Sequence, residues 1–193
     1  MKWRMGDSTE RRPDEDLADY GRLVAKVDQH AARVTSAHAA AFACARGCTG
    51  CCHVELSVFP VEAASIRGWL GGLRVEPEVV PPPAPHAVAL LGLAGRAPCA
   101  MLGADGLCRI YPVRPLICRT HGLPLALEDE DGLAGDVCPL NFDGGADLAD
   151  VDLDDFLVVD TLNVVLVAVN AAYIAAMACD GERVALREIA AGR

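Results

Sequence analysis

Apolar residues in the first part of the chain recur at steps of three and four, which is the spacing of one helix face. The stripe consists of Leu17, Tyr20, Leu23, Val24, Val27, His30, Ala31, Val34 and Ala37. The pattern predicts a helix from Asp14 to about Phe42, where Gly47 and Gly50 follow as breakers. Residues 1–13 are polar, so we expect them to form a flexible N-terminal segment.

Four further helices are predicted from local signals and apolar runs. Pro60 suits the first turn of a helix that reaches about Leu70, since Glu62 lies near its positive end and Gly71 and Gly72 follow it. A short helix is expected over residues 86–94. A long apolar helix is expected over residues 150–179, followed by an amphipathic helix over residues 182–190.

Strands are expected to be few and short. Residues 54–59 form a short apolar run that suits a strand or an extended link. Residues 100–102 and 107–110 suit two brief strands around an Asp105-Gly106 turn. The rest of the region from Cys99 to Pro139 is irregular, and the acidic residues 128–131 suit a solvated loop. Such a long irregular stretch is uncommon unless something else orders it, and metal ligation is the obvious candidate.

Composition agrees with a mainly α fold. Apolar residues make up 52% of the 193 residues and aromatic residues only 5%, so the core is built from Ala, Val and Leu. Alanine and leucine favour helices. We therefore predict a single helical domain over residues 14–193, folded around an irregular, cysteine-ligated metal centre within residues 44–139.

The apolar run from Val164 to Cys179 contains Asn170 as its only clearly polar residue. A transmembrane helix needs about 20 apolar residues, and Asp160 and Asn163 interrupt this run if it is extended backwards. We therefore expect a buried helix or a dimer interface. Residues 150–179 could accordingly bind a second copy or another protein partner, and no membrane is expected.

The formal charge of −10 argues against nucleic acid as a partner, because binding to phosphates depends on Lys and Arg. It also argues against an acidic membrane surface. The first sixteen residues contain no apolar stretch of the kind found in secretory signals, so we expect a cytoplasmic protein. In a reducing compartment nine cysteines are better suited to metal or redox chemistry than to disulfides.

The densest chemistry lies in ten residues that hold four thiols and His53. The cysteines form two sets, the first being Cys44, Cys48, Cys51 and Cys52, and the second Cys99, Cys108, Cys118 and Cys138. We predict that both sets converge around metal as thiolate ligands, since closely spaced thiolates bind zinc or iron–sulfur clusters. Eight thiols equal two four-thiolate sites, or one cluster with spare thiols.

Two neighbouring cysteines rarely bind the same tetrahedral ion, because consecutive side chains point in different directions. One of Cys51 and Cys52 should therefore reach a second metal or the protein core. Spacing does not distinguish zinc from iron. We favour an iron–sulfur cluster, of the 4Fe–4S type, because adjacent thiols and a total of eight suit a polynuclear centre.

Charged residues lie among the second set of cysteines. Arg109, Arg114 and Arg119 could offset thiolate charge, bind an anionic substrate or pair with surface carboxylates. His53 or His121 could replace a thiolate as ligand. We take Arg114, Arg119 and His121 as candidates for binding a cofactor or substrate. Cys179 is expected to be a small core residue.

The spacing Cys44-x3-Cys48-x2-Cys51 resembles the cluster motif of radical SAM enzymes. Those enzymes surround the cluster with a large α/β barrel. Here no βα alternation follows the motif, and the immediate Cys52 departs from it.

Three separated pieces resemble the YkgJ-type cysteine cluster family, a zinc- or iron-chelating domain with a C-x2-C-x2-C-C signature. They are Cys48-Thr49-Gly50-Cys51-Cys52 after Cys44, then Pro98-Cys99 with Gly106-Leu107-Cys108-Arg109, and Arg114-Pro115-Leu116-Ile117-Cys118-Arg119 with Cys138-Pro139 beyond. They cover residues 44–139, and Cys44 lies one residue farther out than the signature expects. One branch of the family resembles flagellin lysine N-methylases, which use S-adenosylmethionine, but this chain shows no obvious methyl-donor glycine loop.

These patterns predict a metal-binding cysteine cluster protein with a redox or modification role. The alternatives are a metal-dependent enzyme acting on a small substrate or protein side chain, methyltransferase-like or radical SAM-like, and a scaffold that binds a partner through its long helix. No nucleophile, base and orienting acid converge by spacing alone, so the sequence names no reaction.

Overall fold

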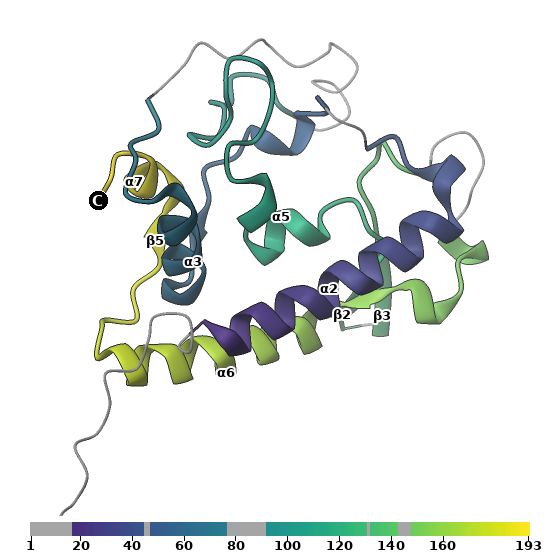
Figure 1. Cartoon of the computed structure of the whole chain (residues 1–193). Coiled ribbons are helices and arrows are strands. Elements are labelled where there is room, and N and C mark those ends of the chain that lie inside the picture. The colour runs from purple at the N-terminus through teal and green to yellow at the C-terminus, as the bar shows by residue number, and fades with distance from the viewer. Residues whose placement is uncertain (1–16, 45–46, 77–91, 131, 143–147) are drawn as a thin grey trace, which may run out of the picture.

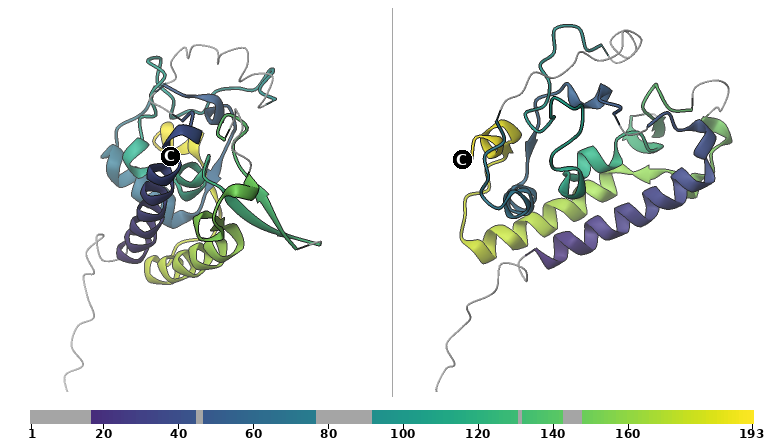
Figure 2. Two further views of the ribbon diagram at one scale, coloured as in Figure 1. Left: turned by 90° about the vertical axis from the view of Figure 1, so that its right-hand side faces the viewer. Right: turned by 45° about the horizontal axis from the view of Figure 1, so that its top comes forward.

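Two long helices support the rest of the molecule. The computed structural model describes residues 17–44, 47–76, 92–130, 132–142 and 148–193. Helices α2 (Ala18–Ala37) and α6 (Val159–Met177) lie side by side and run in opposite directions (Figures 1 and 2). Helices α3 (Pro60–Leu70) and α5 (Leu116–Thr120) pack onto this pair, and the cysteine-bearing segments lie on the far side of α5.

The apolar stripe of the first predicted helix forms the buried face of α2. Tyr20, Leu23, Val27 and Val34 are buried there, as the spacing indicates. The helix is shorter than predicted, because it ends at Ala37 and a 3-10 turn, η1 (Ala39–Ala41), follows it. The expected flexible segment 1–13 lies outside the described residues.

Helix α3 has the bounds that its local signals predict. Pro60 occupies the first turn, and the Glu62 carboxylate accepts a hydrogen bond from the Phe59 backbone N–H at 3.0 Å. Gly71 ends the helix with a φ of 60°, in the left-handed region that glycine adopts without strain. Proline, acid and glycine together therefore define this helix locally.

The long helix predicted over residues 150–179 begins later in the structure than the sequence suggests. Its first residues instead form two 3-10 turns, η4 (Leu148–Asp150) and η5 (Leu153–Asp155), and the strand β4 (Leu157–Val158). Asp155 forms ion pairs with Arg33 and His38 of the α2 region. These long-range contacts hold the acidic stretch in place, so α6 begins only at Val159.

The strands are short, as predicted, but a hairpin was not foreseen. Strands β2 (Leu125–Asp129) and β3 (Gly132–Asp136) pair antiparallel, and β4 pairs parallel with β2. The acidic stretch 128–131 therefore includes the end of β2 rather than being only a loop. Strands β1 (Ser57–Val58) and β5 (Val184–Ala185) form a second, antiparallel sheet.

Other predicted elements are found in reduced form. Leu102 and Cys108 form an isolated antiparallel bridge around the expected turn, where Gly106 has a φ of 73°. The last helix, α7 (Leu186–Ala190), is shorter than the predicted range 182–190 because β5 takes up part of it. Most of the short helix expected over residues 86–94 lies outside the described residues.

The core consists of two apolar clusters that meet at α3. The first cluster is formed by Val58, Ala63, Ile66, Val75, Met101, Ile110, Leu186, Ile189 and Ala190. The second is formed by Tyr20, Leu23, Val27, Val61, Leu116 and Leu166. Val61 belongs to one and Ile66 to the other, so the two faces of α3 join them. The mainly α prediction is confirmed, and the metal centre stays a prediction.

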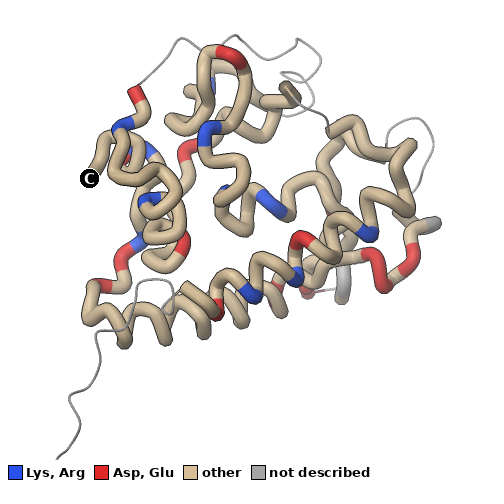
Figure 3. The backbone as a smooth tube through the Cα atoms, viewed as in Figure 1, with Lys and Arg blue, Asp and Glu red and all other residues tan. Residues whose placement is uncertain are grey.

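Helix α6 is much more exposed than the sequence predicts. Only Leu166 and Asn170 are buried along it, while Val164 keeps 70% of its surface exposed. No charged residue interrupts α6 after Asp160 (Figure 3). Its 19 residues are long and apolar enough to cross a membrane by length and composition, with 11% of its most apolar window buried. The prediction that this helix is buried in the chain's own core is therefore wrong, whereas the alternative of a dimer interface stays a prediction.

Candidate metal centre

Cysteines from distant parts of the sequence lie beside one another. The Cys99 backbone N–H donates a hydrogen bond to the Cys52 carbonyl at 2.7 Å, which joins the first cysteine set to the second. Gly50, Cys51 and Cys52 form the 3-10 turn η2. Cys108 is close in turn, because Leu102, three residues after Cys99, pairs with it in the isolated bridge. The segment that carries Cys51 and Cys52 therefore lies beside the segment that carries Cys99 and Cys108, whereas the joint binding of metal by both sets stays a prediction.

Cys118 is supplied by α5, and Arg119 holds this short helix in place. The Arg119 guanidinium donates to both carboxylate oxygens of Asp28 on α2, at 2.8 and 2.9 Å. It also donates to the carbonyls of Arg114, at 2.9 Å, and Pro112. Arg119 is only 9% exposed. These contacts give Arg119 a structural role in positioning Cys118.

A second set of contacts surrounds Cys44. The Asn141 side chain accepts a hydrogen bond from the Ala43 N–H at 3.0 Å and donates to the Gly122 carbonyl at 2.7 Å. Its Nδ2 atom lies 3.4 Å from the Cys44 Sγ atom. The Asn141 backbone N–H donates to the Cys138 carbonyl at 2.8 Å. Asn141 therefore links the segments that carry Cys44 and Cys138.

Gly122 allows the close approach of these segments. Its φ is 93°, and a Cβ atom built there would lie 2.8 Å from the Asn141 Nδ2 atom and 3.1 Å from the Cys44 Sγ atom. A side chain at this position would therefore push Asn141 or Cys44 away. Glycine is needed here for backbone conformation as well as for space.

The environment keeps most of these thiols protonated. Burial raises the pKa of Cys99, Cys108 and Cys138, and it raises the pKa of Cys118 to about 12. The Cys44 side chain is more exposed to solvent, yet the protein atoms around it displace enough water to raise its pKa as well. Neutral thiols do not repel one another, so the metal-free arrangement brings them together without a charge penalty.

Cys51 differs from its neighbours. Its Sγ atom lies 4.0 Å from the Sγ atom of Cys52, and a hydrogen bond from that thiol lowers the pKa of Cys51. His121 and Arg114 lower this pKa further through their charge. The same Cys51–Cys52 contact, followed by burial, raises the pKa of Cys52. Cys51 is therefore the thiol most ready to lose its proton.

The two candidate histidines have different surroundings. His53 is 4% exposed, and its Nδ1 atom lies 3.0 Å from the Thr49 carbonyl. This contact stabilises the turn that carries Cys51 and Cys52. His121 is exposed at the end of α5, within electrostatic reach of Cys51. His121 rather than His53 is therefore placed to meet a ligand.

Arg114 also faces the thiols. Its guanidinium lies 4.1 Å from the centre of the Tyr111 ring. Its charge contributes to the lowered pKa of Cys51, and it offsets only part of the rise in pKa that burial causes at Cys108 and Cys118. Its Nε atom is buried and has no hydrogen-bond partner within the described residues. Arg109 is exposed, and its carbonyl lies 3.4 Å from the Trp69 Nε1 atom.

The donor set suits a soft or borderline metal. The two cysteine sets together supply eight thiols, and thiolate sulfur is the ligand that zinc and iron–sulfur clusters share. Among the residues that the structure describes, no three His, Cys, Asp or Glu side chains lie close enough to hold an ion as they stand. Binding would therefore require the thiols to turn inward and release protons.

Cys179 lies apart from this group. It follows α6 and is exposed, so the prediction that it is a core residue is wrong.

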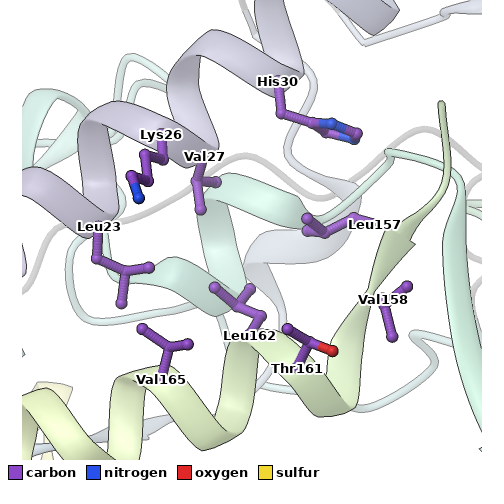
Figure 4. A pocket seen from close by; sticks show the side chains of 9 residues that line it. All are labelled: Leu23, Lys26, Val27, His30, Leu157, Val158, Thr161, Leu162 and Val165. Carbon is purple, nitrogen blue, oxygen red and sulfur yellow. The ribbon is translucent and has the colours of Figure 1, made fainter. Parts of the chain in front are cut away.

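An apolar groove lies elsewhere, between α2 and α6. It measures about 270 Å³ and is lined by Leu23, Lys26, Val27, His30, Leu157, Val158, Thr161, Leu162 and Val165 (Figure 4). Most of these side chains are hydrocarbon, and none is a cysteine. The groove is therefore distinct from the metal-ligand candidates.

A mainly helical fold in which cysteine-bearing segments from two parts of the chain are hydrogen-bonded to each other is typical of a cysteine-rich, metal-chelating class of protein. The chain belongs to the CxxCxxCC family, described as a putative zinc- or iron-chelating domain, whose model matches residues 43–139. Neither the curated proteins nor the solved structures that were compared with the chain gave a match. The family resemblance predicted from the three cysteine-bearing pieces is confirmed.

Sequence reasoning missed Asn141 and Gly122. The pattern of ligand-type residues is visible in sequence, whereas the role of Asn141 depends on contacts with residues 19 to 98 positions away. The position of Asn141, three residues after Cys138, was the only local signal.

Proposed function

We propose that this protein binds metal through thiolates of the two cysteine sets, and that the metal fixes the irregular part of the fold. The proposed ligands are Cys44, Cys48, Cys51, Cys52, Cys99, Cys108, Cys118 and Cys138. The hydrogen bond from Cys99 to Cys52 is the observation that carries the proposal, because it joins the two cysteine sets through residues that lie 47 positions apart in the sequence. The family description supports zinc or iron as the metal.

An iron–sulfur cluster of the 4Fe–4S type is our preferred cofactor, with Zn²⁺ as the alternative. Four thiolates serve either one. The number of thiols and the contact between Cys51 and Cys52 support a polynuclear centre, which would give the protein a redox role. A reducing compartment such as the cytoplasm would keep the thiols available.

Purification without oxygen tests this proposal. Iron, zinc and acid-labile sulfide would be measured per chain, together with the visible spectrum. We expect brown protein with iron and sulfide in similar amounts; colourless protein with zinc would support the alternative metal. A folded protein that contains neither metal and takes up neither would overturn the proposed function.

A metal-dependent enzyme is the second candidate. Arg114 and His121 support it, because both lie within electrostatic reach of Cys51 and Arg114 retains a buried Nε atom that a ligand could engage. An anionic group could bind there beside the metal. Arg119 is a weaker candidate for this role, since Asp28 and two carbonyls already engage its guanidinium.

Binding of an added small anion would distinguish a structural or redox metal site from the metal site of an enzyme. Closed four-sulfur sites leave no position for a small anion, whereas a catalytic site keeps one open. Cyanide added to the metal-loaded protein should change the visible spectrum only if a position is open. An enzyme would also lose this response in Arg114→Gln while its metal content stays the same.

The exposed face of α6 supports self-association. Val164, Val167, Ala168, Ala171 and Ala175 are all exposed and share one stripe at steps of three and four residues. The stripe is uncharged and lies opposite the face that packs on α2 and α3. A second copy carries the same stripe, and an isologous pairing would cover both. We therefore propose that the chain forms a homodimer through this stripe of α6.

A further inference from the structure

Asn141 places a buried amide against the sulfur of Cys44. Its side chain is only 3% exposed, and its Oδ1 and Nδ2 atoms each lie 3.4 Å from the Cys44 Sγ atom. A buried amide costs free energy unless its hydrogen-bonding groups are paired. The partners of the Asn141 amide therefore indicate what this side chain does.

Two backbone groups fix the orientation of this amide. The Ala43 N–H is a donor, so it must face the Oδ1 atom, and its nitrogen lies 3.0 Å from it. The Gly122 carbonyl is an acceptor, so it must face the Nδ2 atom, which lies 2.7 Å away. A flipped amide would set donor against donor and acceptor against acceptor. Because the amide nitrogen carries two hydrogens, the second one is left for the Cys44 sulfur.

The residue after Asn141 holds this turn against the chain that leads to Cys44. The Phe142 backbone N–H donates to the Ala41 carbonyl, and the Phe142 ring lies edge-on to the Phe42 ring with 5.4 Å between their centres. Phe142 is 7% exposed and has a φ of 56°. A residue other than glycine keeps such a left-handed conformation only where its surroundings hold it. Asn141 therefore has little freedom to move away from Cys44.

The same amide can serve Cys44 with and without a metal. A free thiol can donate its S–H to the Oδ1 atom. A cysteine that binds metal has released this proton, so its sulfur can only accept hydrogen bonds. The second Nδ2 hydrogen can then donate to it. Hydrogen bonds to charged acceptors are the stronger ones, so the amide should stabilise the metal-bound sulfur more than the free thiol.

We infer that Asn141 is a positioning residue of the proposed metal centre, which donates an N–H···S hydrogen bond to Cys44 when this cysteine binds metal. The role rests on the proposed metal binding and on Cys44 as one of the ligands. Asn141 acts through the sulfur and does not itself bind the metal. Residues that orient a metal ligand in this way are typically worth about 10- to 100-fold in metal affinity.

A double-mutant cycle on the full chain tests this role, with Zn²⁺ affinity measured by competition with a chelator in the absence of oxygen. Asn141→Leu removes the amide at similar size and should weaken Zn²⁺ binding about 10- to 100-fold. In a Cys44→Ser background the same exchange should have little further effect, because the sulfur that the amide serves is gone. Asn163→Leu is the matched control, since Asn163 is exposed on α6, and it should bind Zn²⁺ like the wild type.

Three results would count against the account. An equal loss of affinity in both backgrounds would overturn the inference, because Asn141 would then only support the fold. Wild-type affinity in Cys44→Ser would overturn it as well, since Cys44 would not be a ligand. A wild type that binds no metal at all would instead overturn the proposed function.

The wild type provides a second measurement that keeps the inference testable if a variant loses its helical signal in far-UV circular dichroism. The protein would be loaded with ¹¹³Cd²⁺, which binds thiolates as Zn²⁺ does and is visible by NMR. One side-chain amide proton of Asn141 should show scalar coupling to the metal through the N–H···S hydrogen bond. Loaded protein in which no Asn141 amide proton couples to ¹¹³Cd²⁺ would overturn the inference.

Discussion

Asp155 shows how single side chains hold the end of α2 against the segment before α6. Its carboxylate accepts a hydrogen bond from His38 at 2.7 Å and pairs with Arg33, and it is only 6% exposed. The bond from His38, followed by that from Arg33, lowers the pKa of Asp155. A lowered folded-state pKa means that the ionised group stabilises the native state and that this contribution disappears in acid.

Asp155→Asn should reduce the free energy of unfolding by about 1.5–3 kcal/mol near pH 6, the usual contribution of a hydrogen bond to a charged group. The difference from wild type should be full above the ordinary aspartate pKa of 3.8 and should shrink as the pH falls through the lower native value. Urea unfolding at several pH values measures it. The exposed neighbour Asp152 provides the control variant Asp152→Asn, which should change little. An effect of Asp155→Asn that does not diminish at pH 3 would contradict this explanation.

At the residue scale, the sequence points to candidate ligands, which stay a prediction, but not to the residues that arrange them. Eight cysteines and their spacing are readable because thiolate chemistry needs those residue types. Asn141, Gly122 and Glu62 are ordinary residues whose roles arise only when distant segments meet. Arg119 was singled out for its charge, yet its contacts with Asp28 serve the fold.

Elements with strong local signals were predicted well, and those that depend on distant partners were not. Pro60, Glu62 and Gly71 define α3 within a dozen residues, so its bounds were read correctly. The β2–β3 hairpin and the start of α6 depend on one another, because β4 pairs with β2 just before α6 begins. The spacing of apolar residues within residues 150–158 gives no signal of the pairing between β4 and β2.

Glu62 connects two elements and offers a test at this scale. Its carboxylate accepts hydrogen bonds from the Phe59 N–H and from the Leu116 N–H, each at 3.0 Å, and it is 3% exposed. Glu62→Ala should leave two backbone donors without partners and cost about 2–4 kcal/mol in unfolding free energy. Chemical denaturation would measure the loss.

The exposed Glu182 provides a matched control, because Glu182→Ala removes an acid without uncapping a helix. Glu62→Ala should also weaken metal binding, since Leu116 begins the helix that carries Cys118. A Glu62→Ala protein as stable as the Glu182→Ala protein would show that α3 does not need this link.

At the scale of the whole molecule, the proposal that a second copy covers the exposed apolar face of α6 can be tested in solution. Light scattering with size-exclusion chromatography should give the mass of a dimer for the wild type. Val164→Glu should give a monomer, because it places a charge within the apolar stripe. Leu153→Glu is the control, since Leu153 is 86% exposed but lies outside α6, and it should remain dimeric. A monomeric wild type would contradict the interface.

X-ray absorption spectroscopy of the metal-loaded protein tests the central claim most directly, because it reports which atoms surround the metal. If thiolates from both cysteine sets bind it, the nearest shell consists of sulfur, at about 2.3 Å for zinc. That shell should lose sulfur in Cys52→Ser and in Cys99→Ser alike. A shell made mainly of oxygen or nitrogen, or one that neither exchange alters, would contradict the account.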